Sequence, residues 1–187
     1  MDTKTAIILI VAIVAVAIAA WALIQRERTR KLKHQFGPEY DRVLEHSKDP
    51  RRAEAILDQR QKRVAKFQIR PLSREQCDRF AADWRAVQEH FVDSPREAVS
   101  QADVLINQAL KARGYPMGDF EQQAADISVD HPRVVENYRI AHEIALRDEA
   151  GKATTEDLRK AMQHYRKLFE DVLDAHVTQY EEVRHAK

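Results

Sequence analysis

The sequence predicts an all-α protein, in which one N-terminal transmembrane helix is followed by a multi-helix cytoplasmic bundle. Apolar residues recur at spacings of three and four through most of the chain after residue 36. No segment shows a strong strand-like alternation, and most breaks in the pattern join a helix stop to a helix start. About 160 residues follow the apolar N-terminal segment, which is enough for one domain with its own core.

The first element is residues 6–24, a run of nineteen residues without a charged side chain. A helix that crosses a hydrocarbon core of roughly 30 Å needs about this length. A lone span must also satisfy its own backbone hydrogen bonds, which only a helix does. Trp21 lies near the end of the run, where an indole suits the headgroup level. We therefore expect a short N-terminal tail over residues 1–5 and a transmembrane helix over residues 6–24, with the lipid bilayer as its partner.

Residues 25–35 form a basic juxtamembrane segment. Lys4 is the one basic residue before the apolar run, whereas five follow it: Arg26, Arg28, Arg30, Lys31 and Lys33. Basic residues are retained on the cytoplasmic side, so the N-terminus is expected to face out and residues 36–187 to form a cytoplasmic α-helical domain. A second interpretation of these five side chains is contact with anionic lipid headgroups.

A cleaved signal peptide is the alternative to an anchor. Ala17-Ile18-Ala19 has the small-x-small form of a cleavage site, and the domain would then be exported. Three features favour the anchor instead. The residues before the run are nearly neutral, the run is longer than a usual signal-peptide core, and a basic cluster follows it at once.

Composition excludes several classes of protein. Beyond residue 35 the chain carries 25 basic and 28 acidic residues, so it lacks the basic footprint of a nucleic-acid binder. Cys77 is the only cysteine, which excludes an internal disulfide and a multi-cysteine zinc site. The four glycines form neither of the common phosphate-binding loop motifs. We therefore expect no nucleic-acid partner and no cofactor.

Proline and capping residues predict the helix boundaries of the domain. Phe36-Gly37-Pro38 interrupts the helix that leaves the membrane, and Pro38 suits the first position of the next one. Asp49-Pro50 begins another helix. Arg70-Pro71 should end it, because the residue before a proline avoids helical angles.

Two capping boxes are predicted in the middle of the chain. Ser73 pairs with Gln76 ahead of a continuous apolar stripe. Ser94-Pro95 begins the next helix, with Glu97 reaching back to the cap, and Gly114 is its natural stop.

The remaining helices follow a loop over residues 115–118. A short helix is predicted over residues 119–127, and Asp130-His131-Pro132 begins another that ends before Gly151. Thr154 then caps the last helix. That helix carries residues at alternating spacings of four and three, close to a coiled-coil period: Leu158, Met162, Tyr165, Phe169, Val172 and His176. The stripe is either the inward face of a bundle helix or a seam for a partner or a homo-oligomer.

The eight histidines do not predict a metal site. A helical site needs His and carboxylate ligands three or four residues apart on facing helices. The one Glu-x-x-His pair, Glu182 and His185, lies in the polar tail. Cys77 sits on an apolar stripe and is expected to be packed rather than reactive. No catalytic or metal-binding residue is therefore predicted.

Residues 113–132 are the densest mixture of loop, aromatic, acidic and histidine residues in the chain. A recognition surface, if the domain has one, is first expected here. Its candidate residues are Arg113, Tyr115, Asp119, Phe120, Asp130 and His131. The alternative is that these residues cap helices and pack a crossover between them.

Several phrases of the sequence resemble a family of bacterial single-pass membrane proteins with an N-terminal hydrophobic segment, a short basic stretch and a helical domain. The phrases span nearly everything after the anchor: Phe36-Gly-Pro-Glu-Tyr-Asp-Arg42, Ile69-Arg-Pro-Leu72, Trp84-Arg-Ala-Val-Gln88, Phe91-Val-Asp93, Arg113-Gly-Tyr-Pro116, Asp119-Phe-Glu-Gln122, Ser128-Val-Asp-His-Pro132 and Thr155-Glu-Asp-Leu158. The resemblance implies a bacterial inner-membrane protein. It implies no activity and assigns no residue a role.

Three functional hypotheses follow. The first is a non-enzymatic, membrane-tethered module whose helical domain binds a protein partner. The second is a bundle that binds a small ligand or acts as an enzyme through a polar site near residues 113–132. The third is an envelope-stress or lipid-associated protein that acts through the basic juxtamembrane segment.

Overall fold

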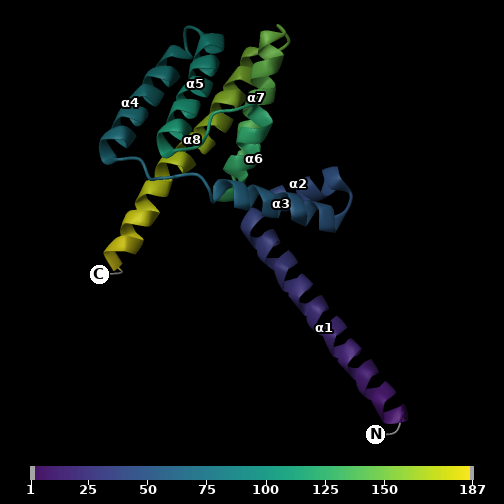
Figure 1. Ribbon diagram of the computed structural model, residues 1–187. Coiled ribbons are helices and arrows are strands. Elements are labelled where there is room, and N and C mark those ends of the chain that lie inside the picture. The colour runs from purple at the N-terminus through teal and green to yellow at the C-terminus, as the bar shows by residue number, and fades with distance from the viewer. Residues whose placement is uncertain (1–2, 186–187) are drawn as a thin grey trace. The chain divides into compact units, whose positions relative to one another are not determined.

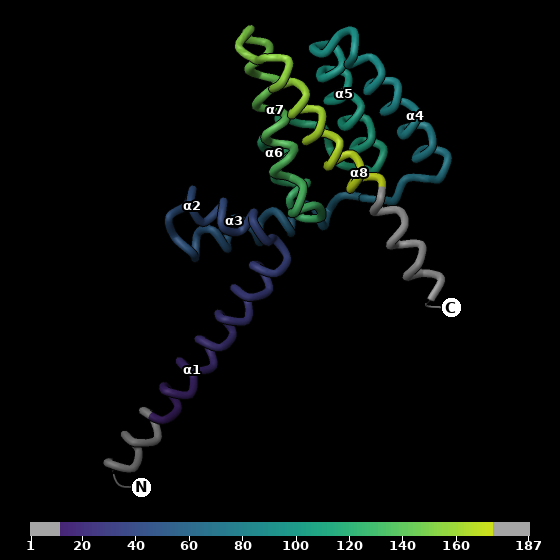
Figure 2. The backbone as a smooth tube through the Cα atoms, turned by 180° about the vertical axis from the view of Figure 1, so that it is seen from behind, coloured from purple at the N-terminus to yellow at the C-terminus, as the bar shows by residue number. Residues whose placement is uncertain are grey.

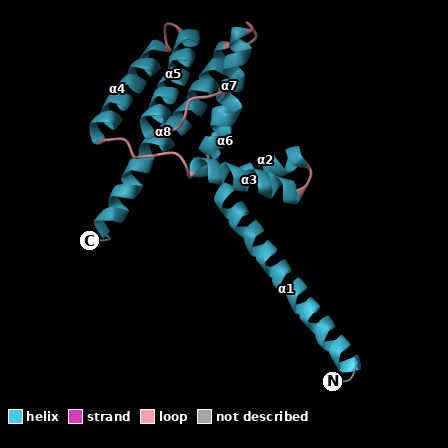
Figure 3. Cartoon of the chain, viewed as in Figure 1, coloured by secondary structure: helices cyan, strands magenta, loops and turns pink. Residues whose placement is uncertain are grey.

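The computed structural model of this chain describes residues 3–185, and side chains over residues 12–173. The described residues form eight helices and no strand (Figures 1 and 3), so the all-α fold class is confirmed. By contact the chain divides within α3 into two compact units, Met1–Leu57 and Asp58–Lys187. The helices are α1 (Thr3–Phe36), α2 (Pro38–Ser47), α3 (Pro50–Val64), α4 (Arg74–His90), α5 (Pro95–Arg113), α6 (Phe120–Asp130), α7 (Val135–Glu149) and α8 (Thr155–His185).

In the first unit, α1 continues without a break from the apolar segment through the basic segment to Phe36. Gly37 then adopts a positive φ of 48°, and Pro38 takes the first turn of α2. The predicted interruption at Phe36-Gly37-Pro38 is therefore confirmed. The glycine permits the turn because it has no Cβ to clash in this conformation.

A buried carboxylate links the three helices of the first unit. Oε1 of Glu54 on α3 accepts a hydrogen bond from the Thr29 hydroxyl of α1 at 2.5 Å, and the Tyr40 hydroxyl of α2 lies 3.5 Å away. Burial raises the pKa of Tyr40, and the negative charge of Glu54 raises it further, so the phenol remains a donor. The apolar side chains buried in this unit are Leu32, Phe36, Tyr40, Val43, Ala53 and Leu57.

The predicted transmembrane helix is not supported by the structure. Over the residues whose side chains are described, no helix is both long and apolar enough to cross a membrane. Residues 6–11 of the predicted span lie outside that range.

The second unit is a helical bundle arranged around α8. This helix packs against α5 and α7, while α4 packs on α5 and α6 on α7 (Figures 1 and 2). The rings of Trp84 on α4 and Phe169 on α8 stack with their centroids 4.6 Å apart. Apolar stripes of all these helices meet in one core, which explains the three- and four-residue spacing of the sequence.

The apolar stripe of α8 faces this core. Leu158, Met162, Tyr165, Phe169 and Val172 are all buried. The interpretation as an inward bundle face therefore holds for these five residues, and their surface is occupied within the chain. The sixth residue of the stripe, His176, lies outside the described side chains.

Several predicted helix ends are confirmed. Ser73 and Gln76 form the complete capping box, with reciprocal bonds of 3.1 and 2.8 Å. Gly114 ends α5 in the left-handed region with φ of 100°. Thr154 caps α8: the Asp157 backbone N–H donates to the Thr154 hydroxyl at 3.2 Å.

The predicted end of α3 at Arg70-Pro71 is wrong, because the helix stops at Val64. The backbone N–H groups of Lys66 and Phe67 donate to carbonyls three residues earlier and close the helix in a turn. The backbone N–H of Arg70 donates to the carbonyl of Arg113 at 2.8 Å, so this stretch pairs with the corner after α5 instead of continuing the helix.

One predicted cap and two further boundaries differ from expectation. Ser94 makes no side-chain cap, and the reciprocal bond is also missing, because the Ser94 backbone N–H donates to the carbonyl of His90 and the Glu97 carboxylate bonds the His90 ring at 3.1 Å. The helix predicted over residues 119–127 continues to Asp130. The next begins at Val135, because residues 131–134 form a turn that places the His131 side chain in the bundle.

Candidate functional site

The structure brings together most of the candidate residues of the 113–132 segment, but it buries half of them. Arg113, Tyr115 and His131 are buried, and Phe120 is half-buried. Asp119 and Asp130 are exposed. Gly114 makes this arrangement possible: its left-handed conformation ends α5 and turns the chain so that the side chains on either side both point inward.

Arg113, His131 and Asp171 form a chain of hydrogen bonds that joins α5, the turn after α6, and α8. Nη1 of Arg113 lies 2.8 Å from Nε2 of His131. Because a guanidinium can only donate, Nε2 must accept, and the imidazole proton is on Nδ1. Nδ1 donates this proton to the carboxylate of Asp171. The ring therefore bridges the buried guanidinium of Arg113 and the partly exposed carboxylate of Asp171.

The same arginine has a second buried contact. Its Nη1 also donates to the carbonyl of Val172 at 3.3 Å, and the guanidinium lies 6.0 Å from the centre of the Tyr115 ring. Nη1 thus has two acceptors and the guanidinium lies near a π face, whereas its buried Nε has no hydrogen-bond partner among the described residues. This arrangement fits a structural tie at the end of α5.

Tyr115 binds Asp130 across the segment. Its hydroxyl donates to Oδ2 of Asp130 at 2.6 Å. Burial raises the pKa of Tyr115 well above its usual range, and the neighbouring charge of Asp130 raises it further. The phenol is therefore held as a neutral donor and closes the loop that leads from α5 to α6.

Asp119 and Phe120 have local roles at the start of α6. Oδ1 of Asp119 accepts the backbone N–H of Gln122 at 3.0 Å, so Asp119 is the N-cap. The Phe120 ring stacks on the imidazole of His142 with centroids 3.6 Å apart, and lies 4.9 Å from the Tyr138 ring. These contacts pack α6 against α7.

Asp126 is a buried acid of the 113–132 segment that was not among the six candidate residues. Nε of Arg63 on α3 donates to both carboxylate oxygens of Asp126 on α6, at 3.0 and 3.2 Å. The side-chain amide of Gln122 donates to Oδ1 of Asp126 at 2.9 Å. Nη1 of Arg60 lies 3.1 Å from the Ser128 hydroxyl. The available signal was a polar residue between Ala124 and Ile127 on a short apolar helix.

A second missed network lies between α5 and α8. The Tyr165 hydroxyl donates to Oδ1 of Asp103 at 3.0 Å, and the Asn107 amide donates to Oδ2 at 3.1 Å. Burial raises the pKa of Asp103, although the bond from Tyr165 opposes the shift. Asp103 interrupts the apolar stripe of its helix, which was the sequence signal for a buried polar contact.

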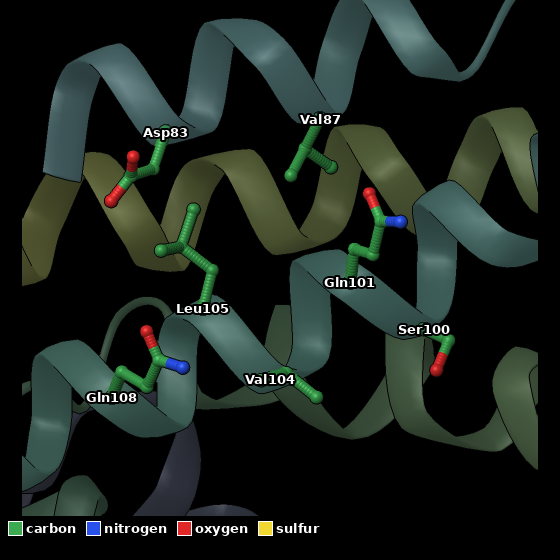
Figure 4. A pocket seen from close by; sticks show the side chains of 7 residues that line it. All are labelled: Asp83, Val87, Ser100, Gln101, Val104, Leu105 and Gln108. Atoms are coloured by element: carbon green, nitrogen blue, oxygen red, sulfur yellow. The ribbon is translucent and has the colours of Figure 1, made fainter.

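An open groove of about 310 Å³ lies between α4 and α5. In Figure 4, Asp83 and Val87 extend from α4 toward Leu105 and Gln101 on α5. The floor is apolar, and the polar side chains sit around it. The lining residues are Asp83, Val87, Ser100, Gln101, Val104, Leu105 and Gln108. None of them was a candidate from the sequence.

The surface of α1 has two chemically distinct parts. The large apolar side chains near its middle have exposed fractions between 50% and 68%: Ile13, Val14, Val16, Ile18, Trp21, Leu23 and Ile24. The five basic residues that follow are also exposed: Arg26, Arg28, Arg30, Lys31 and Lys33. Arg51 of α3 lies over the Trp21 ring, with its guanidinium carbon 5.8 Å from the ring centroid.

Metal ligands do not gather in the described part of the chain: no group of three His, Cys, Asp or Glu side chains is placed to hold an ion. Glu182 and His185 lie outside the described side chains. Cys77 is half-buried and packs against the core of the second unit.

Comparison with known proteins gives no assignment, since no family model, no curated protein and no solved structure matches this chain. Function must therefore be argued from the chain's own residues. Two surfaces are available for that argument: the exposed apolar and basic parts of α1, and the groove between α4 and α5.

Proposed function

We propose that this protein is a membrane-tethered helical interaction module. In this proposal residues 6–24 anchor the chain in a bacterial inner membrane, and the helical bundle binds a protein partner. The observation that carries the proposal is the unburied apolar surface of α1 between Ile13 and Ile24. Contiguous apolar surface of this kind marks a site that a membrane or another protein covers.

The distribution of these side chains favours lipid over a protein partner. A helix turns by about 100° per residue, so the large apolar residues from 13 to 24 occupy most of the circumference. Alanines fill the remaining strip: Ala12, Ala15, Ala19 and Ala22. A helix that docks on one protein face needs a single apolar stripe, whereas one surrounded by lipid is apolar on every side.

The basic residues after the apolar segment support one orientation. Five exposed cations follow Ile24, whereas Lys4 alone precedes the segment. The positive-inside rule then gives an N-terminus outside and a bundle in the cytoplasm. The partner of the module would accordingly be a cytoplasmic protein.

For the partner we propose an amphipathic helix that lies in the α4–α5 groove. An apolar floor between two helices is a common receptor for the apolar face of a third. Val104 is 52% exposed there, and Asp83 stands at the rim as the acceptor for a basic residue of the partner. Glutamine side chains at the edge supply further donors and acceptors.

Topology tests the anchor. A reporter active only in the cytoplasm and one active only after export would be fused in turn to Lys187. We expect cytoplasmic activity, with the fusion retained in membranes after an alkaline wash. Activity of the export-dependent reporter would overturn the orientation and support cleavage near Ala17-Ile18-Ala19. A fusion that washes off would overturn the tether.

A photocrosslinking residue at Val104 tests the groove. It should crosslink to a partner whose contact peptide is an amphipathic helix with a basic residue, and Val104→Glu should abolish that capture in a pull-down. Val92→Glu is the matched control, since Val92 is 81% exposed in the turn before α5 and outside the groove. Equal losses from both variants would remove the groove from the proposal.

A further inference from the structure

We propose that the turn between α2 and α3 is a second point of contact with the bilayer, where Lys48, Arg51 and Arg52 bind anionic lipid headgroups. This inference rests on the proposed membrane anchor and extends it. In this inference α2 and α3 bring a second set of basic side chains to the headgroups, in addition to those of the basic segment of α1.

The contact between Arg51 and Trp21 fixes the depth of the turn. Trp21 lies in the last turn of the apolar segment, three residues before Ile24. The guanidinium carbon of Arg51 is 5.8 Å from the centroid of its ring. An indole at the end of a span sits at the headgroup level, so the guanidinium of Arg51, thirty residues later in the chain, lies near that level.

The Arg51 guanidinium therefore lies closer to the apolar segment than the far part of the basic segment does. A helix rises about 1.5 Å per residue, which places Arg26 about 3 Å beyond Ile24 and Lys33 about 14 Å beyond it. Salt screens charges beyond roughly 8–10 Å at cellular ionic strength. Lys33 is thus outside strong reach of headgroups next to Ile24, whereas Arg51 is beside the ring of Trp21.

The fold holds the basic turn in place. Glu54, one helical turn after Arg51, is buried and accepts the Thr29 hydroxyl of α1. The turn itself is ordered by the carboxylate of Asp49, which accepts the backbone N–H of Arg51 at 3.0 Å. The position of Arg51 over Trp21 is therefore supported from both sides.

The charges of the turn favour an anionic surface. Lys48, Arg51 and Arg52 are exposed, and the acidic residues nearby are Glu45 and Asp49. The Asp49 carboxylate already accepts a backbone bond. A guanidinium over an indole face is a stable pair at the boundary of water and hydrocarbon, and its remaining N–H groups are suited to phosphate oxygens. The cytoplasmic leaflet supplies such anionic headgroups.

A spin label on the turn tests the inference in the full-length protein. His46 is exposed near the end of α2, so a His46→Cys change in a Cys77→Ser background gives one labelling site. The labelled protein would be reconstituted in vesicles of phosphatidylcholine, alone or with phosphatidylglycerol added. We expect the label to lose most of its accessibility to a water-soluble nickel chelate only in the anionic vesicles, and to regain it at high salt.

Two charge-removal variants make the comparison specific. The triple change K48Q/R51Q/R52Q should remove the protection of the label. The change R30Q/K31Q/K33Q takes the same number of charges from the far part of the basic segment and should leave the protection in place. Circular dichroism checks that both variants keep their helix content.

The outcomes separate this inference from the anchor beneath it. If the protein stays in the vesicles but its label is equally accessible in both lipids, or if both triple variants behave alike, the turn does not bind headgroups and the anchor stands. If the protein does not stay in vesicles of either composition, the anchor and the inference fail together.

Discussion

Individual polar residues decide how the second unit is held together. Asp103 and Asp126 interrupt apolar helix stripes, and each is bonded by side chains from other elements. The sequence predicts that such residues are unusual, because an unpaired buried carboxylate is costly. It does not predict their partners: Tyr165 is 62 residues from Asp103, and only the packed fold brings the two together.

Replacing His131 tests the strongest of these ties. His131→Ala should lower the free energy of unfolding by about 2–4 kcal/mol, since it leaves the buried Arg113 without its ring acceptor. Chemical denaturation followed by circular dichroism measures the loss.

A second histidine–carboxylate pair provides the control. His90 and Glu97 are 36% and 70% exposed, whereas the His131 side chain is 4% exposed. His90→Ala should therefore cost less than about 1 kcal/mol, as for other surface pairs. Similar losses from the two replacements would mean that burial does not set the strength of the Arg113–His131–Asp171 chain.

The titration of Asp103 gives a pH prediction. Burial raises the folded-state pKa of Asp103 above its ordinary value of 3.8. The folded protein then holds this proton more tightly than the unfolded chain. The contribution to stability is complete below pH 3.8 and is lost as the pH rises through the folded-state pKa.

Carboxyl carbon shifts in an NMR titration measure this directly. The midpoint for Asp103 should lie above 3.8, while that for Asp157 should lie below it, because the Thr154 backbone N–H lowers the pKa of the Asp157 carboxyl. A midpoint for Asp103 at or below the ordinary value would contradict the prediction, and would mean that the hydrogen bonds from Tyr165 and Asn107 outweigh the cost of burying the charged carboxylate.

At the level of elements, the sequence predicted the boundaries that local signals specify, at starts and at ends alike. The capping box at Ser73 and the glycine stop at Gly114 act within a few residues, so the sequence contains all that specifies them. The end of α3 at Val64 does not depend on such a signal. Beyond it the chain bonds a distant segment, because the backbone N–H of Arg70 donates to the carbonyl of Arg113, and no local signal predicts this pairing.

The corner at Gly114 is expected to tolerate no side chain. A Cβ added there would lie 2.4 Å from the carbonyl oxygen of Gln68, and φ is 100°. Gly114→Ala should therefore destabilise the protein by more than about 1 kcal/mol from the backbone conformation alone, and the clash should add to this loss.

Gly118 supplies the matched control, because its Cβ would meet nothing within 4 Å and its φ is not in the left-handed range. Gly118→Ala should leave the unfolding midpoint nearly unchanged. The comparison is made by thermal or urea denaturation of the two variants. Equal midpoints would show that the corner relaxes and that the contact of Gly114 with Gln68 does not constrain it.

For the whole molecule, the all-α class was predictable and the order of packing was not. The class follows from apolar spacing, which is a local property. The packing of α8 between α5 and α7 depends on contacts between distant segments, and the sequence pattern of α8 fitted a partner seam as well as a bundle face. For the 113–132 segment, the sequence showed its aromatic, acidic and histidine residues but not that Arg113, Tyr115 and His131 are buried.

The division of the chain predicts that the second unit is stable alone. A protein comprising residues 58–187 has the bundle core and its internal polar ties, so it should keep its helix content and unfold in one cooperative transition. Urea denaturation with circular dichroism and near-ultraviolet signals gives the test. Separate transitions for the two signals would mean that residues before Asp58 complete the bundle.

The unbroken helix α1 has a mechanical consequence. Its 34 residues run from Thr3 to Phe36, and a helix transmits twist about its axis with little slack between its ends. If the apolar part is anchored, a change in its tilt or rotation reaches Leu32 and Phe36 in the first unit directly. Each residue inserted ahead of Gln25 should therefore rotate the apolar segment of α1 by about 100° relative to the α1 residues that pack against α2 and α3.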